Sequence, residues 1–246
     1  MRTVYILWLR ELKKYFRSRS RMIGSLGQPL LFLLTFGFGR IYSQAGEGNY
    51  IQFLAPGIIS MTILFTGNFS GISLIWDKQF GFLKETLVAP VPRLSIMLGK
   101  TLGGATVALL QGTIVFVMTL FIGFRPISLS GLPMAFFFAF MIALFFTSLG
   151  IAIASTLEDM QGFQLIMNFL VMPIFFLSGA LFPPADLLAV LGIVTKLNPL
   201  SYGVDGLRSV LIGISSYSTF MDFSIMLLLS LLILFIGSSL FGKIKS

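Results

Sequence analysis

Residues 76–100, WDKQFGFLKETLVAPVPRLSIMLGK, decide the fold, because this charged stretch with two prolines separates two long apolar segments. Its charged residues are Asp77, Lys78, Lys84, Glu85, Arg93 and Lys100. A charge in the middle of a bilayer costs roughly 2.5–3.5 kcal/mol, so this stretch does not cross a membrane. We expect it to lie in water or among lipid headgroups, with membrane-spanning segments on both sides.

The composition of the chain is that of a polytopic membrane protein. Of its 246 residues, 56% are hydrophobic and only 11% are charged, and the mean hydropathy is +0.96. A soluble domain of this length could not bury so much apolar surface. The absence of Cys and His removes disulfides, thiol chemistry and the commonest metal ligand, so we expect no metal site and no catalytic residues.

Charge-poor segments outside this stretch are long enough to cross the membrane as helices. We predict an all-α fold in a single transmembrane domain, residues 1–246, with six spans at 22–39, 53–76, 101–124, 134–157, 160–182 and 223–241. The second span contains Gly67 and Gly71, spaced as in a helix-packing motif. Residues 185–220 have an apolar run too short to cross, and we expect short re-entrant helices there, tolerable only when packed against the spans.

The distribution of basic residues predicts the orientation. Of the 17 Lys and Arg residues, 13 lie in the N-terminal segment, the central stretch and the C-terminus. The other four, Arg40, Arg125, Lys196 and Arg208, lie in the remaining connections. By the positive-inside rule, both termini and the central stretch are cytoplasmic and residues 185–220 are extracellular. This distribution also explains the net charge of +8 without nucleic acid.

Residues 1–21 form a basic amphipathic helix on a helical wheel. We expect it to lie flat on the cytoplasmic leaflet and contact membrane lipid, with a solvated helix as the alternative. One arc holds Val4, Tyr5, Trp8, Leu9, Leu12, Tyr15 and Phe16, and the opposite arc holds Arg2, Arg10, Lys13, Lys14 and Arg17.

The first half of the central stretch can also form a helix. Residues 77–88 make about three turns with Phe80, Leu83 and Leu87 on one side, before Pro90 and Pro92 end the helix. Such a helix suits a docking surface for another protein. The alternative is an interfacial helix that rests on lipid.

Motifs for chemistry are incomplete. Gly99-Lys100-Thr101 resembles the end of a phosphate-binding loop, but Leu94 stands where that motif needs a Gly, so we interpret Lys100 as an anchor at the inner boundary of the third span. The adjacent carboxylates of Glu158 and Asp159 do not face one another on a helix and indicate a solvated turn. Asp205 and Arg208 are three residues apart, and we expect them to pair.

Two patterns carry a resemblance to a known family. Residues 77–91, DKQFGFLKETLVAPV, contain a charged, Gly-containing loop that runs into Leu-x-x-Ala-Pro, and residues 198–202, NPLSY, are followed after five residues by Arg208. Together with six spans in this orientation, they resemble the permease subunit of type-2 ABC transporters, which include drug, polysaccharide and lipid-linked glycan exporters. The resemblance covers nearly the whole chain. It departs at Lys78 and Gln79, where many relatives carry a second acidic residue or Arg.

The resemblance implies a plasma (inner) membrane exporter that works as a dimer with a second copy or a homologous permease. Each permease would dock on a separate ABC ATPase subunit that holds ATP and Mg²⁺, so this chain would carry no cofactor and would not be an enzyme. The resemblance implies that residues 77–95 are the coupling loop, with Asp77, Lys78, Phe80, Gly81, Leu83, Lys84, Glu85, Leu87 and Pro90. The N-terminal helix would lie at the membrane and also contact the ATPase, through Trp8, Arg10, Leu12, Lys13, Lys14 and Arg17. Residues 185–220 would form the outer gate, with Asn198, Pro199, Tyr202, Asp205 and Arg208.

The residues disfavour two other functions. An ion-driven secondary transporter usually has ionisable groups near mid-membrane and internal repeats, whereas here the charges lie at predicted boundaries. An intramembrane enzyme is disfavoured by the lack of His, Cys and convergent carboxylates. Spans rich in Phe and Leu favour a hydrophobic or amphipathic substrate over a small ion, and both drug-like compounds and lipid-linked glycans remain open.

Overall fold

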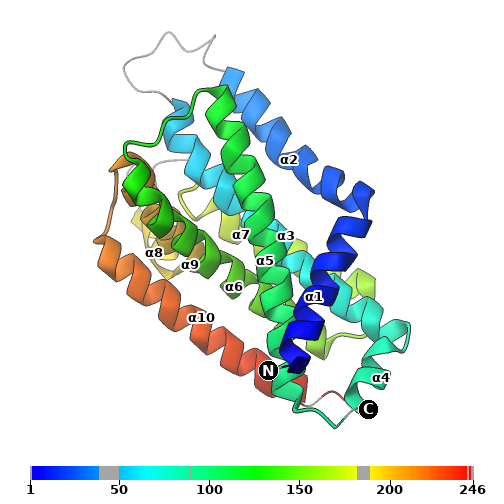
Figure 1. Ribbon diagram of the computed structural model, residues 1–246. Helices are drawn as coiled ribbons and strands as arrows, with labels where there is room; N and C mark the ends of the chain where they lie inside the picture. Colours follow the sequence, from blue (N-terminus) through cyan, green and yellow to red (C-terminus); the bar gives the residue numbers. More distant parts are fainter. Residues whose placement is uncertain (1, 39–49, 89, 182–188, 243, 245–246) are drawn as a thin grey trace.

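The computed structural model describes residues 2–38, 50–88, 90–181, 189–242 and 244, and its regular elements in these ranges are helices (Figure 1). Residues 39 and 182, which end two predicted spans, and residues 185–188, which begin the predicted outer gate, lie outside the described residues. The elements are α1 (Arg2–Arg17), α2 (Arg19–Phe38), α3 (Tyr50–Gln79), α4 (Phe82–Val88), α5 (Arg93–Ile122), a short 3-10 turn η2 (Leu129–Gly131), α6 (Leu132–Thr156), α7 (Met160–Phe176), α8 (Ala189–Leu197), α9 (Pro199–Ile212) and α10 (Thr219–Gly242). The predicted all-α class is confirmed.

Four helices in the described ranges are long and apolar enough to cross a membrane: α3, α5, α6 with its preceding turn, and α10. Two shorter apolar helical stretches, Met22–Thr35 in α2 and Met160–Phe176 in α7, fall on the predicted first and fifth spans. Each of the six predicted spans therefore coincides with an apolar helix, and the number of crossings stays a prediction.

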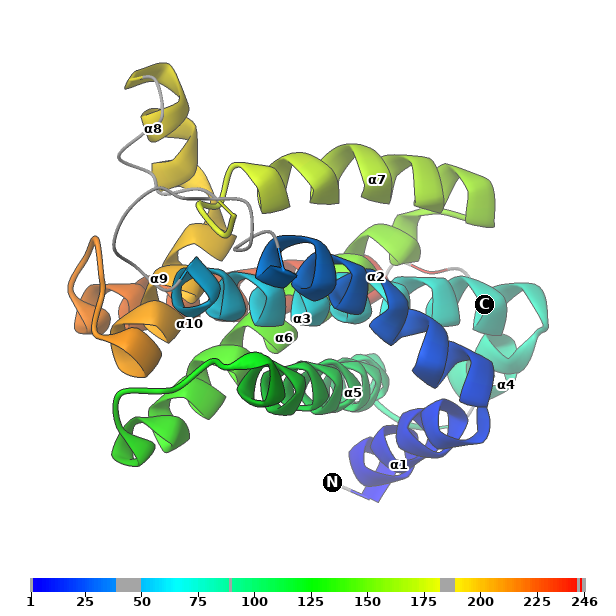
Figure 2. The same cartoon turned by 90° about the horizontal axis from the view of Figure 1, so that it is seen from above.

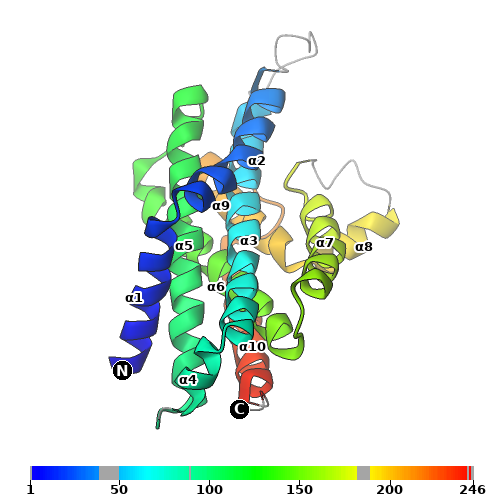
Figure 3. The same cartoon turned by 90° about the vertical axis from the view of Figure 1, so that its right-hand side faces the viewer.

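The centre of the bundle is α3, which packs against α6 on one side and α5 on another, as Figure 3 shows. Its glycines make the approach to α6 possible. A Cβ atom at Gly67 would lie 3.1 Å from the backbone nitrogen of Thr147, and one at Gly71 would lie 2.5 Å from the carbonyl oxygen of Gly150. The helix-packing interpretation of Gly67 and Gly71 is thus confirmed, and small residues let the two backbones come close.

Two boundaries differ from the sequence interpretation. Helix α3 continues past Trp76 to Gln79, and α5 begins at Arg93 rather than at residue 101. The connection between them therefore shrinks to residues 80–92, and α4 has seven residues instead of three full turns. Charged residues do not end these two helices, because the side chains of Asp77, Lys78 and Lys100 form hydrogen bonds inside the protein.

Helix α1 runs beside the first half of α5 in both side views (Figures 1 and 3). The indole of Trp8 donates to the hydroxyl of Thr106 at 3.0 Å, and a Cβ at Gly99 would lie 2.7 Å from the Cβ of Leu7. This arrangement corrects the prediction of a simple apolar arc, whereas the position of α1 on the membrane stays a prediction. Leu7 is buried although it was off that arc, whereas Tyr5 and Phe16 on the arc are each 58% exposed.

Seen from above, α7 and α8 stand apart from the tight group of α3, α5, α6, α9 and α10 (Figure 2). Helix α7 buries only every fourth residue, Phe163, Met167, Val171 and Phe175. Its other sides carry exposed apolar residues that include Leu165 and Phe169. In water such a surface would be unfavourable, so it fits contact with lipid or another protein.

Candidate functional site

The short helix α4 is fastened to one end of the bundle on one side only. Gly81 has φ of +78°, a left-handed conformation that allows the chain to turn between α3 and α4. Leu83 is 2% exposed, and the ring of Phe82 lies under the guanidinium of Arg10, 3.7 Å from its centre. In contrast, Phe80 is 83% exposed and Val88 is 79% exposed.

This geometry differs from the expected coupling helix. Phe80 lies in the turn before α4, and it points outward while Leu83 points inward, so these two side chains do not share a face. A partner protein cannot press on Leu83 directly. Glu85 and Pro90 are exposed. The side chains of Lys84 and Leu87 lie outside what the structure describes.

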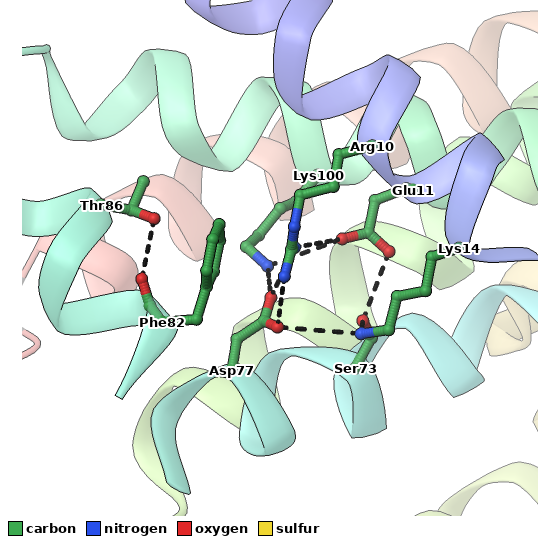
Figure 4. Close-up of polar contacts among 8 residues, drawn as sticks. All are labelled: Arg10, Glu11, Lys14, Ser73, Asp77, Phe82, Thr86 and Lys100. Atoms are coloured by element: carbon green, nitrogen blue, oxygen red, sulfur yellow. Dashed lines mark hydrogen bonds and ion pairs between the residues drawn. The ribbon is translucent and has the colours of Figure 1, made fainter. Parts of the chain in front are cut away.

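Beside α4, a cluster of charged side chains joins three helices, as Figure 4 shows. Arg10 on α1 donates two hydrogen bonds to the carboxylate of Asp77 on α3, at 3.0 and 2.9 Å. Lys100 on α5 donates to the same carboxylate. Lys14 lies 3.7 Å from Asp77 and donates to the hydroxyl of Ser73 at 2.7 Å. Asp77 is therefore bound by cations from two other helices.

Glu11 is the second carboxylate of this cluster. It lies 3.2 Å from Arg10 and 3.7 Å from Lys100, and it accepts a hydrogen bond from Ser73 at 3.3 Å. The cluster thus contains three cations and two carboxylates. Together with Phe82, which Arg10 contacts, it ties α1, α3, α4 and α5 to one another.

Burial makes this pairing obligatory. Asp77 is 4% exposed and Lys100 is 3% exposed, and a charge removed from water is tolerated only with close partners. Lys100 is consequently not a boundary anchor, as the sequence suggested, but a buried partner of Asp77. Burial lowers the pKa of Arg10 on α1, but the hydrogen bonds to Asp77 and the negative charge of Asp77 outweigh this effect, so the pKa is raised. Burial lowers the pKa of Lys14, against the attraction of Asp77 and Glu11.

Lys78, predicted to lie in the coupling loop, instead caps the end of α6. Its ammonium donates to the carbonyl oxygens of Ala154, Ser155 and Leu157 at 2.8, 2.8 and 2.9 Å. These carbonyls are left without partners where a helix ends, and a cation there also complements the helix dipole. In the next turn of chain, Asp159 accepts a hydrogen bond from the backbone of Gly162 and caps α7.

The predicted residues of the N-terminal helix separate into two groups. Arg10 and Lys14 turn inward to Asp77. Trp8 bonds to α5, and Leu12 is partly buried. Lys13 and Arg17 are exposed, and their contact with headgroups stays a prediction.

At the opposite end of the bundle, the residues of the second sequence pattern, 198–208, hold the segments around α9 in place. Asn198 caps α9 by accepting from the backbone of Leu200 at 3.0 Å, Pro199 is its first residue, and the hydroxyl of Tyr202 donates to the carbonyl of Lys196 at 2.6 Å. These contacts fix the junction of α8 and α9.

Asp205 and Arg208 do not form the expected ion pair in the described part of the chain. The carboxylate of Asp205 accepts hydrogen bonds from the backbone of Ser216 and Tyr217 at 2.9 Å. Arg208 donates to the carbonyls of Ala180 and Phe53 at 2.9 and 3.3 Å, and its guanidinium stacks 3.6 Å above the centre of the Phe53 ring. Each side chain therefore ties α9 to a different segment.

Sequence reasoning missed Glu11, Ser73 and Phe82. The available signal was Asp77, a carboxylate placed at the end of an apolar segment, because such a group requires a partner. The sequence does not say which of the basic residues supplies it. Arg10 is 67 positions away, and only the packing of α1 against α5 brings it close.

Comparison with known proteins places this geometry in context. A family model described as "ABC-2 type transporter" matches residues 2–212, from α1 to α9. The putative transport permease ycf38 of Cyanophora paradoxa is 30% identical over 226 residues, which are 89% of this chain and 76% of that protein. Nodulation protein J of Rhizobium leguminosarum bv. trifolii is 27% identical, with 85% and 78% covered. The inner membrane transport permease YadH of Escherichia coli (strain K12) is 25% identical, with 89% and 87% covered.

Proposed function

The chain belongs to the ABC-2 type transporter family, and from this membership we propose that it forms the substrate path of an ATP-driven exporter. It is a membrane transport subunit. In the proposal, it works as a dimer with a second copy or a homologous permease. Separate ATPase chains bind and hydrolyse ATP with Mg²⁺, and the cargo is hydrophobic or amphipathic.

The proposed topology has six spans in the plasma (inner) membrane, with both termini and α4 in the cytoplasm. Its support is the agreement of six apolar helices with the predicted spans and the 13 basic residues on the proposed inner side. The start of α1, helix α4 and the end of α10 also lie at one end of the bundle in Figure 1.

One observation carries the mechanism. The turn into α4 exposes Phe80, while Leu83 is buried and Phe82 lies against Arg10 of the charge cluster. Force applied to α4 by a closing ATPase would therefore reach α1, α3 and α5 together, since Asp77, Arg10 and Lys100 join them. Tilting of this unit in both permeases would open the path.

We place the dimer contact and the path on the side formed by α2, α3 and α7, the first, second and fifth proposed spans. The ring of Phe175 on α7 lies 6.4 Å from that of Phe32 on α2 and 6.3 Å from that of Phe65 on α3. The exposed apolar residues of α7, with Leu31 of α2, supply a surface that a second permease can cover.

The test compares two exposed apolar residues at opposite ends of the molecule. F80D should weaken binding of the co-expressed ATPase about tenfold or more, and should abolish its stimulation and ATP-driven export, because a charge replaces an exposed anchor. L129D changes an equally exposed residue in the turn before α6 and should leave coupling intact. Thermal unfolding of both variants should match the original protein. Normal coupling in F80D, or export by the chain without an ATPase, would refute the proposal.

A further inference from the structure

A cavity of about 280 Å³ lies between α1, α2, α3 and α5. Its lining from α3 runs from Met61 to Ser73, from the middle of that helix toward the end nearest α4. Helix α7 contributes no residue to it, but Phe65 of α3 belongs both to its lining and to the side proposed above for the dimer contact, so the two adjoin. In the proposed orientation the cavity extends from the middle of the membrane toward its cytoplasmic side.

The wall formed by α3 is unusually polar for a membrane helix. Thr62, Thr66, Ser70 and Ser73 recur every three or four residues and therefore share one side of the helix. Opposite them, α2 contributes Ser25 and Gln28. Polar side chains within membrane helices lie at contacts between helices or along a water-filled cavity, and these four line a cavity.

Polar side chains on both walls of the cavity, Ser25 of α2 and Ser73 of α3, are held in position before any ligand binds. The amide of Gln111 on α5, which is fully buried, donates to the hydroxyl of Ser25 at 2.6 Å and also to the hydroxyl of Tyr15. Ser73 is fixed by Lys14 and Glu11. Preorganised groups lose little freedom on binding, which favours affinity.

The charges at the cavity indicate what it accepts. Among the lining residues that the structure describes, Glu11 is the only charged one, and its carboxylate is already matched by Arg10, Lys100 and Ser73. This described lining therefore offers no uncompensated carboxylate to a cation and no basic side chain to an anion. The remaining lining is apolar: Pro29, Met61, Phe65, Phe69 and Val107.

We propose that this cavity binds the neutral head of an amphipathic molecule that carries hydroxyl or amide groups, with the apolar part of that molecule against Phe65 and Phe69. This inference rests on the proposed function: the molecule is the cargo, taken from the inner leaflet before ATP drives its release. Hydroxyls that both donate and accept hydrogen bonds suit such a head better than a formal charge does.

Two glycines on α2 provide a matched pair of labelling sites, since the chain has no Cys. Gly24 lines the cavity, whereas Gly27, one turn away, does not. A Cβ atom at either position meets nothing within 4 Å, so both cysteine variants should fold. We would measure the reaction of G24C and G27C with a maleimide in nanodiscs, without ATPase or nucleotide.

The probes are three amphiphiles with the same chain: octyl glucoside, octyl sulfate and octyltrimethylammonium, each below its micelle-forming concentration. Octyl glucoside should slow labelling of G24C at least threefold more than the charged probes do, and should not protect G27C. Equal protection by all three probes, or best protection by the ammonium compound, would overturn the neutral-head assignment. Failure of an aqueous maleimide to reach G24C would overturn the hydrated cavity.

A second pair of substitutions tests the hydroxyls directly. T66V keeps the shape of the side chain and S70A removes one oxygen, and each should raise the concentration of octyl glucoside for half-maximal protection of G24C by about three- to tenfold. Unchanged protection in both would show that these hydroxyls do not bind the head. Adding the ATPase then separates the two proposals: protection that ATP does not relieve would leave the binding site standing but contradict its use in export.

Discussion

Replacing Asp77 with Asn should destabilise the end of the bundle where α1, α3, α4 and α5 meet. The substitution keeps the size of the side chain but removes the carboxylate that Arg10, Lys14 and Lys100 share. Three cations then remain with one carboxylate, Glu11, so the net charge of the cluster rises from +1 to +2. Lys100 suffers most, because it is 3% exposed and its remaining partner is 3.7 Å away.

The size of the effect follows from the cost of an unpaired buried charge. Removing one partner of a buried ion pair costs about 3–5 kcal/mol. For a chain of this size, about 1 kcal/mol corresponds to a shift of about 2–4 °C in the unfolding temperature, so D77N should unfold about 6–20 °C below the original protein. The double variant D77N/K100M removes the stranded cation as well, and it should recover most of this loss.

The assay is thermal unfolding followed by tryptophan fluorescence in detergent. Both Trp residues of the chain report on this region, because Trp8 packs on α5 and Trp76 precedes Asp77 in α3. E85Q, which neutralises an exposed carboxylate on α4, is the matched control and should change stability by no more than about 0.5 kcal/mol. An unfolding temperature of D77N within about 1 °C of the original, or no recovery in D77N/K100M, would refute the role of Asp77.

Two further predictions concern helix contacts. G71L adds a side chain at a position where even a Cβ atom would lie 2.5 Å from the carbonyl oxygen of Gly150, so it should abolish the peak of folded protein in size-exclusion chromatography. G24L has open space around its Cβ and should elute normally. K78M removes the cation that binds three carbonyls at the end of α6, and it should cost about 1–3 kcal/mol in thermal unfolding, with K78R intermediate; an unchanged midpoint in K78M would contradict the capping role.

Local signals predicted the helices well because they act over short distances in the sequence. The cost of burying charge in a bilayer predicted where the apolar helices lie, and the small pair Gly67 and Gly71 predicted a close helix contact; the structure contains both. The basic residues around the central stretch predict an orientation, which stays a prediction. In the structure, Pro133 and Pro199 stand in the first turns of α6 and α9, a position that the fixed φ of proline suits.

The function of individual polar residues did not follow from the same signals. Asp77 and Lys78 are neighbours in one charged stretch, yet one binds cations from α1 and α5 and the other caps α6. Arg208 and Asp205 lie on one helix and bind different loops. In each case the partner comes from a distant part of the chain, so spacing along the sequence could not identify it.

The sequence by itself thus determined that this chain is a helical membrane protein of the ABC-2 type and where most of its helices lie, because hydrophobicity and charge are summed residue by residue. Only the tertiary structure decided which charges are buried, which side of α1 faces α5, and that Phe80 is exposed while Leu83 is not. The physical reason is that a buried charge is stabilised by a particular neighbour in space, and the packing of several helices selects that neighbour.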